Sequence, residues 1–144
     1  QPAMSPLASA SASASASATS AGLPALVADA DADADADASG DIAGWCSLSD
    51  WSPKRAYATS KDESIYIADG FRGQGIGRAL LAAVLDEATH LGVQVVMAGV
   101  VACQQPSLAL HRALGFEQSA LNLHMGYKLG AWHDVVYLQR HLWR

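Results

Sequence analysis

The stretch FRGQGIGRALL, residues 71–81, has the composition of an anion-binding turn. Its glycines and arginines stand between a strand pattern and a helix pattern. Such a turn points several backbone N–H groups at one spot, at the positive end of a helix dipole, which suits a phosphate or pyrophosphate. The spacing Arg72-x-x-Gly75-x-Gly77 is neither GxGxxG nor GxxxxGK[ST], so dinucleotide-fold and P-loop sites fit poorly. A tight turn that merely needs glycine is the alternative.

Histidines and a cysteine in the second half of the sequence do not have the spacing of a metal site. His124, His133 and Cys103 have no ligand partners at the short intervals typical of zinc sites, so we expect no zinc centre. His133 and Asp134 are adjacent, and a hydrogen-bonded pair at a strand edge accounts for them as well as a catalytic role does.

The elements that must position these residues alternate between strand and helix patterns. Apolar residues at helical spacing predict a helix over Gly75–Leu91, which Gly92 ends. Strands are expected at Ala25–Ala28, Ile42–Leu48, Glu63–Ala68, Val93–Val101, Phe116–Met125 and Asp134–Leu142, with a short helix from Pro106 that Gly115 closes, a polar loop at Asp50–Asp62 and a turn at Gly126–His133. This order predicts an α/β domain whose first two strands form a hairpin with an enlarged tip.

Two repetitive tracts interrupt this pattern, SASASASASA at Ser9–Ala18 and DADADADADA at Asp29–Ala38. Their side chains bury too little apolar surface to offset the entropy of ordering, so both tracts are expected to be mobile. We expect residues 1–22 to be a low-complexity segment without fixed structure. Residues 23–144 are expected to form one domain, with residues 29–39 as an Asp/Ala-rich loop insertion.

The charge balance argues against a nucleic-acid partner. Five of the 14 acidic residues lie in the second tract, and the other nine equal the nine basic residues in number. A near-neutral domain without a polybasic stripe lacks the electrostatic footprint of a nucleic-acid binder. Trp45, Trp51 and Trp132 are therefore expected to be packing residues and not a platform for stacking bases.

Localisation is inferred from the absence of targeting signals. The first basic residue is Lys54, so the sequence shows no charged region of a signal peptide, and no apolar run approaches the roughly 20 residues that span a bilayer. Cys46 and Cys103 lie far apart and form no CxxC pair, which favours reduced thiols. We expect a cytoplasmic protein without a membrane partner.

Four segments together resemble one acetyltransferase family. The glycine turn between a strand and a helix is similar to the acetyl-CoA signature of the GNAT superfamily. In order and spacing, the segments ESIYI, RGQGIGRALL, PSLALHRALGF and GYKLGAWHDVVYLQR resemble the phosphinothricin N-acetyltransferase family, over about Leu26–Arg140. The histidine of ALHRALGF and the GYK…GxWHD block carry the family likeness, whereas the glycine signature alone indicates the superfamily.

The resemblance implies the GNAT fold, a bent mixed β-sheet with flanking helices. Its two central strands, here Glu63–Ala68 and Val93–Val101, are expected to splay apart and admit the pantetheine arm of acetyl-CoA. Free backbone groups of Ile65 and Ile67 would pair with the arm and polarise the thioester carbonyl. The resemblance assigns these residues to acetyl-CoA: Ile65, Tyr66, Ile67, Arg72, Gly73, Gln74, Gly75, Ile76, Gly77, Arg78, Gln104 and Ser107.

Two titratable residues correspond to catalytic positions of the family. Glu63, at the mouth of its strand, matches the catalytic glutamate, and His111 stands where most GNAT members have a tyrosine that protonates the departing thiolate. With ordinary pKa values near 4.3 and 6.5, the carboxyl needs burial or a water relay, and the imidazole could act as acid or base. Ser107 could orient His111 or contact acetyl-CoA. On residue type alone, an exposed strand-end carboxylate and a half-buried helix histidine are the simpler interpretation.

The acceptor is expected to be a small amino-acid-like amine of the phosphinothricin or methionine sulfoximine type. The family uses a basic and aromatic loop to hold its acidic substrate, and here SPKRAY supplies Lys54, Arg55 and Tyr57. Lys128 of GYK would be brought near the site. A solvated loop and strand end account for these residues too. The family likeness also suggests a homodimer.

Three departures from the family pattern leave a second function class open. Gln104 replaces a common asparagine, the loop between Tyr57 and Glu63 is one residue longer, and the strand and two helices with which the family begins are not found. The chain is therefore either an active N-acetyltransferase or a GNAT-like module that binds acetyl-CoA without turnover. Glu63 and His111 favour the enzyme.

Overall fold

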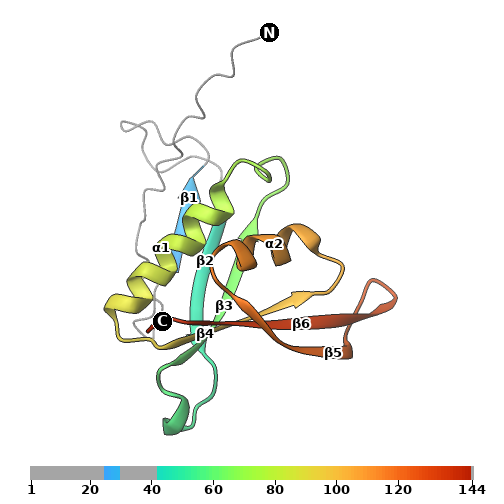
Figure 1. Ribbon diagram of the computed structural model, residues 1–144. Helices are drawn as coiled ribbons and strands as arrows, with labels where there is room; N and C mark the ends of the chain where they lie inside the picture. Colours follow the sequence, from blue (N-terminus) through green and yellow to red (C-terminus); the bar gives the residue numbers. More distant parts are fainter. Residues whose placement is uncertain (1–24, 30–41, 144) are drawn as a thin grey trace.

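The computed structural model describes residues 25–29 and 42–143, which form one mixed sheet with two helices (Figure 1). The strand order is β1-β2-β3-β4-β6-β5, with β3 and β4 parallel and the other neighbours antiparallel. The elements are β1 (Ala25–Asp29), β2 (Ile42–Asp50), the 3₁₀-helix η1 (Arg55–Tyr57), β3 (Ser60–Ile67), α1 (Ile76–His90), β4 (Val95–Val101), α2 (Gln105–Ala113), β5 (Glu117–Lys128) and β6 (Ala131–His141). The predicted α/β class and first hairpin are confirmed, whereas residues 1–22 and 30–39 of the predicted tracts lie outside the described residues.

The sequence-based boundaries differ from the observed ones in two places that matter for function. β3 begins at Ser60, because its residues from Lys61 onward pair with β2, so Glu63 lies inside the strand and not at its mouth. β5 and β6 continue through most of the predicted turn and reverse at Leu129 and Gly130, which have φ angles of 53° and 76°. A two-residue turn with positive φ at both positions matches the twist of a hairpin. Leucine is not typical of such turns, so the residue type at position 129 did not predict one.

One face of the sheet is buried under both helices. Buried side chains alternate along the central strands, as expected for strands with one face in the core: Cys46 and Leu48 on β2, Val96, Ala98 and Val100 on β4, and Val136 and Leu138 on β6. α1 buries Ile76, Leu80, Leu81, Val84, Leu85 and Ala88 in the same cluster, and α2 adds Leu108. A Cβ on Gly77 of α1 would lie 3.3 Å from Leu110 of α2 and 3.6 Å from Ile67 of β3, so both helices meet over this face.

Neither described helix covers the opposite face. Alternation along β2 and β3 directs Trp45, Asp62, Ser64 and Tyr66 to that side. Trp45 and Tyr66 are cross-strand partners there, with ring centroids 6.3 Å apart, and both are exposed. The sheet therefore separates a filled helical side from a helix-free side.

Within the described part of the chain, no helix is long and apolar enough to cross a membrane. The same residues contain no group of three or more His, Cys, Asp or Glu side chains placed to hold a metal ion.

Candidate functional site

The parallel strands β3 and β4 separate halfway along their length. They pair from Ser60↔Val95 to Glu63↔Ala98, after which β3 remains paired with β2 and β4 with β6. The facing edges of Ser64–Ile67 and Gly99–Val101 therefore form a fork. This confirms the predicted splay of the two central strands.

Two residues of β3 direct their backbone N–H and C=O groups into the fork. The Ser60 carbonyl accepts a hydrogen bond from Trp51 N, and Ala68 N donates to the Ala43 carbonyl, so the even-numbered residues direct their backbone groups toward β2. Because these directions alternate along a strand, Ile65 and Ile67 direct theirs toward β4, where pairing has ended. Arg72 Nε donates to the Ile67 carbonyl at 3.4 Å. An extended chain entering the fork would meet the backbone groups of Ile65 and Ile67 on this edge, where Arg72 contacts the Ile67 carbonyl.

The glycine turn lies between β3 and the N-terminus of α1. Gly70, Gly73 and Gly75 have φ angles of 90°, 75° and 81°, and a Cβ on any of them would meet no atom within 4 Å. Left-handed φ angles explain why glycine stands there, since other residues adopt them at a cost. No side chain caps α1, and its first turn carries no acidic residue. Its uncapped N-terminus has the geometry that suits an anion, and the exposed Arg72 beside it lies 3.4 Å from the exposed Asp69 carboxylate.

Glu63 and His111 meet beneath the fork on the helical side of the sheet. His111 Nε2 lies 2.9 Å from Glu63 Oε2, and 1% and 2% of the two side chains are exposed. His111 Nδ1 lies 2.7 Å from the Ser107 carbonyl. Phe116 packs edge-to-face on the imidazole at 5.1 Å. Ser107 therefore contacts His111 through its backbone carbonyl.

This geometry assigns the protons of the pair. A carbonyl oxygen only accepts, so Nδ1 carries a hydrogen, and one further proton must lie between Nε2 and the Glu63 carboxyl group. Burial lowers the pKa of His111, but the hydrogen bond and charge of Glu63 outweigh it, and the Ser107 carbonyl adds to the net rise. The raised pKa of His111 favours the imidazolium form beside the Glu63 carboxylate.

Two residues without a predicted catalytic or binding role also border Glu63. Cys46 Sγ lies 3.9 Å from Glu63 Oε1, and burial together with the nearby carboxylate raises the pKa of the thiol far above its usual range. Asp62 precedes Glu63 and faces the helix-free side, half-buried. Burial and the charge of Glu63 raise its pKa. The period-two alternation of β3 is the signal that could have separated Asp62 from Glu63.

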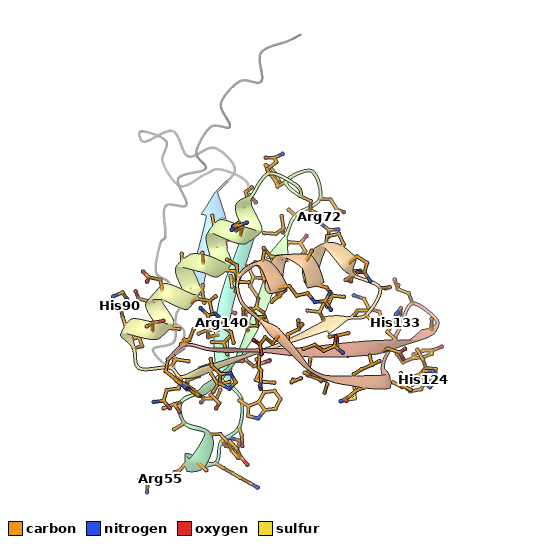
Figure 2. The ribbon with its side chains drawn as sticks, in the orientation of Figure 1. Arg55, Arg72, His90, His124, His133 and Arg140 are labelled. Atoms are coloured by element: carbon orange, nitrogen blue, oxygen red, sulfur yellow. The ribbon has the colours of Figure 1, made fainter. Side chains whose placement is uncertain are left out.

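The structure does not gather the predicted acceptor residues around the glycine turn. Lys54, Arg55 and Tyr57 are exposed at η1, and Figure 2 shows Arg55 at the opposite end of the molecule from Arg72. Lys128 is exposed at the end of β5. Gln104 precedes α2 directly after the β4 end of the fork, where its N–H donates to the Val101 carbonyl.

One lesser expectation is wrong. His133 and Asp134 do not bond to each other, because His133 Nε2 lies 3.1 Å from the Lys128 carbonyl while Asp134 accepts from His124 N at 2.9 Å. Successive residues on β6 face opposite sides of the sheet, which separates the two side chains.

Two of the three tryptophans predicted to be packing residues pack against tyrosines: the ring centroids are 6.3 Å apart for Trp45 and Tyr66 and 5.2 Å apart for Trp132 and Tyr127. All three are partly exposed, with Trp45 at 39%, Trp51 at 43% and Trp132 at 61%.

Comparisons with known proteins agree with this fork and turn. Residues 16–116 match the model of the acetyltransferase (GNAT) family. A methionine sulfoximine/methionine sulfone acetyltransferase from Pseudomonas aeruginosa is 36% identical over 104 residues, 72% of this chain and 60% of the relative. The chain belongs to the GNAT acetyltransferase family.

Solved structures extend the likeness to three dimensions. A phosphinothricin acetyltransferase from Sinorhizobium meliloti in complex with acetyl-CoA is 36% identical, with a TM-score of 0.73, and the match covers 83% of this chain and 61% of that one. A ribosomal-protein-alanine N-acetyltransferase from Brucella melitensis, also 36% identical, has a TM-score of 0.73 over 84% of this chain and 70% of that one. The chain spans about 60% of the length of the curated relatives it matches.

Proposed function

We propose that this protein transfers the acetyl group of acetyl-CoA to the amine of a small amino-acid-like acceptor, of the phosphinothricin or methionine sulfoximine type. The observation that carries the proposal is the fork between β3 and β4 with the open glycine turn at its mouth. Relatives named for methionine sulfoximine, methionine sulfone and phosphinothricin support the acceptor class.

Acetyl-CoA fits the residues of the fork and the turn. Backbone groups of Ile65 and Ile67 would pair with the pantetheine arm, with Arg72 releasing the Ile67 carbonyl. The turn from Arg72 to Arg78 would bind the pyrophosphate through backbone N–H groups. Gln104 and Ser107, at the start of α2, and Tyr66 on the opposite face of β3 border the same fork. The bound donor supplies a thioester whose carbonyl carbon accepts the amine.

The Glu63–His111 pair is proposed to handle protons during transfer. The 2.9 Å contact supports an imidazolium that is held charged by Glu63. Because both ring nitrogens have buried partners, His111 would protonate the departing thiolate through a relay or after a rotation of the ring. In this role Glu63 acts through His111 as a positioning residue. That Glu63 itself accepts the ammonium proton stays a prediction from the family likeness, and the near-complete burial of its side chain requires a relay for it.

Lys54, Arg55, Tyr57 and Lys128 are proposed to contribute to acceptor recognition through charge-assisted hydrogen bonds to a carboxylate and a phosphinyl or sulfoximine group. Their exposure leaves these side chains available to a ligand. Because they occupy two separate ends of the fold, a second copy of the chain is one way to complete a single acceptor site.

A homodimer is therefore part of the proposal. The β5–β6 hairpin exposes a set of large apolar side chains, Leu121, Leu123, Met125, Tyr127 and Trp132, as partner surfaces do. Light scattering coupled to size exclusion would give the mass of a dimer, and the mass of one chain would overturn this part.

The deciding experiment is a thiol-release assay with acetyl-CoA. The panel contains phosphinothricin, methionine sulfoximine, methionine sulfone, a polyamine, an aminoglycoside and a peptide with an N-terminal alanine. We expect release with the acidic amino acids, with the acetylated product verified by mass spectrometry. If acetyl-CoA raises the melting temperature but no acceptor releases thiol, the binding-module alternative replaces the enzyme.

A further inference from the structure

Asp62 and Glu63 occupy opposite faces of the sheet at the rung where the fork opens. Asp62 pairs with Met97 and Glu63 with Ala98, the last rung between β3 and β4. Successive side chains on a strand point to opposite sides. A thioester held between the two strands would therefore have one of these carboxyl groups on each side.

The helical side of the fork is filled by the protein itself. Glu63 is 6% exposed, His111 1%, Ala98 1% and Leu108 3%. Glu63 is also occupied, because Oε2 contacts His111 and Oε1 contacts Cys46. An ammonium group arriving from solvent on this side would have to displace core side chains that are packed at interior density.

The helix-free side offers access and a carboxylate. Asp62 is half-buried, and among the residues described no donor bonds its side chain. Its neighbours on this face of the adjacent strands, Ser49 on β2 and Met97 on β4, carry no charge. Tyr66 and the exposed Trp45 lie further along the same face.

Resting on the proposed function, we propose that the acceptor amine approaches the fork from the helix-free face and that Asp62 is the carboxylate that takes its proton. In this arrangement the two proton transfers take place on opposite faces of the sheet. Asp62 serves the incoming amine on one side, and the Glu63–His111 pair serves the departing thiolate from the other.

The step balances without any further reactant. The ammonium gives one proton to the Asp62 carboxylate, which passes it to solvent. The freed nitrogen lone pair forms the C–N bond, and the C–S bond breaks with its electron pair on sulfur. A second N–H proton leaves the nitrogen as the amide forms, and sulfur takes a proton from His111, which is then reprotonated. The products are the amide, CoA thiol and one proton.

The electrostatics of Asp62 agree with this role. Burial and the charge of Glu63 raise its pKa, which makes it a stronger base than a solvated aspartate. The other charged group near it on its own strand is Lys61, which is on the opposite face and paired with Asp50 at 2.6 Å. The phenol of Tyr66 is the titratable group on the same face of β3.

The test compares Asp62→Asn with Asp62→Glu in the full chain, with Asp86→Asn on the exposed side of α1 as the matched control. We expect Asp62→Asn to lower kcat by about a hundredfold, with the Kd for acetyl-CoA changed less than twofold and the acidic limb of the pH–rate profile lost. Asp62→Glu is expected to restore part of kcat and the acidic limb. Melting temperatures identify any variant that fails to fold.

Three outcomes overturn the inference in distinguishable ways. In the first, folded Asp62→Asn has the kcat and pH profile of the parent, while Glu63→Gln loses activity. Glu63 would then be the base, and the proposed function would not be affected. Equal losses in Asp62→Asn and Asp62→Glu, with no change in pH profile, would make Asp62 structural. A parent that binds acetyl-CoA but acetylates no member of the panel would remove the proposed function and the inference together.

Discussion

His111 Nε2 on α2 lies 2.9 Å from Glu63 Oε2 on β3, 48 residues away in the sequence, and almost no solvent reaches either side chain. The contact fastens the second helix to the strand that opens the fork. The pair also shares a proton on the helical face of the sheet, next to the fork in which the thioester of acetyl-CoA is expected. One pair of side chains thus serves both the packing of α2 and the proposed chemistry.

Truncating one partner of this pair should destabilise the fold. Glu63→Ala leaves a buried imidazole without its counter-charge, for which we expect a loss of roughly 3–5 kcal/mol in the free energy of unfolding. Glu87→Ala, on the exposed side of α1, should cost below about 1 kcal/mol. Urea denaturation measures both, and equal losses in the two variants would contradict the buried ion pair.

The stability of the protein should depend on pH through His111. Its pKa is raised in the folded protein, so the folded state binds the proton more tightly than the unfolded chain. The resulting stabilisation is fully present below the unfolded pKa of about 6.5 and is lost as pH rises through the higher folded value.

Replacing Glu63 by Gln removes the charge that raises this pKa. NMR titration of the imidazole should then show a lower pKa, and the fall in the free energy of unfolding above about pH 6.5 should flatten. An unchanged imidazole pKa in Glu63→Gln would argue against a charged carboxylate at this position.

The anion-binding turn can be tested with a pair of glycines in the same backbone conformation. Gly75 and Gly92 have φ angles of 81° and 79°, and a Cβ would meet no atom at either position. Alanine at each should cost about 1–2 kcal/mol of stability through strain alone. We expect Gly75→Ala alone to lose the thermal stabilisation by acetyl-CoA, because Gly92 follows the far end of α1. Similar retention of stabilisation in both variants would exclude the turn as the donor site.

The loop that carries η1 should affect the acceptor and not the donor. Lys54→Ala and Tyr57→Phe each remove a polar group from an exposed site, and we expect the KM for acidic amino acids to rise roughly tenfold because hydrogen bonds to charged groups are lost. The KM for acetyl-CoA should not change. Arg112→Ala, an exposed cation on α2, controls for net charge. Unchanged KM values for the acceptors would mean that the loop is solvated and does not bind the acceptor.

The order of the elements and the position of the glycine turn could be predicted from the sequence. Helical spacing from Ile76 to Leu91 and the glycine at position 92 predict α1 to within a residue at each end. The turn could be predicted because glycines with left-handed φ before an uncapped helix are a local feature, readable from a few adjacent residues. The family likeness added the splay of two strands, which the pairing of β3 with β4 confirms.

Which carboxyl group faces which side of the sheet could not be predicted from the sequence, because it depends on how the strands pair. Adjacent residues on one strand look equivalent in sequence, but where β3 begins and how it registers against β2 put Glu63 under α2 and Asp62 on the helix-free face. A shift of one residue in register would exchange them. The partner of His111 and its proton depended on how α2 packs on the sheet. Such long-range contacts leave no local pattern, because side chains 48 residues apart meet only when the core forms.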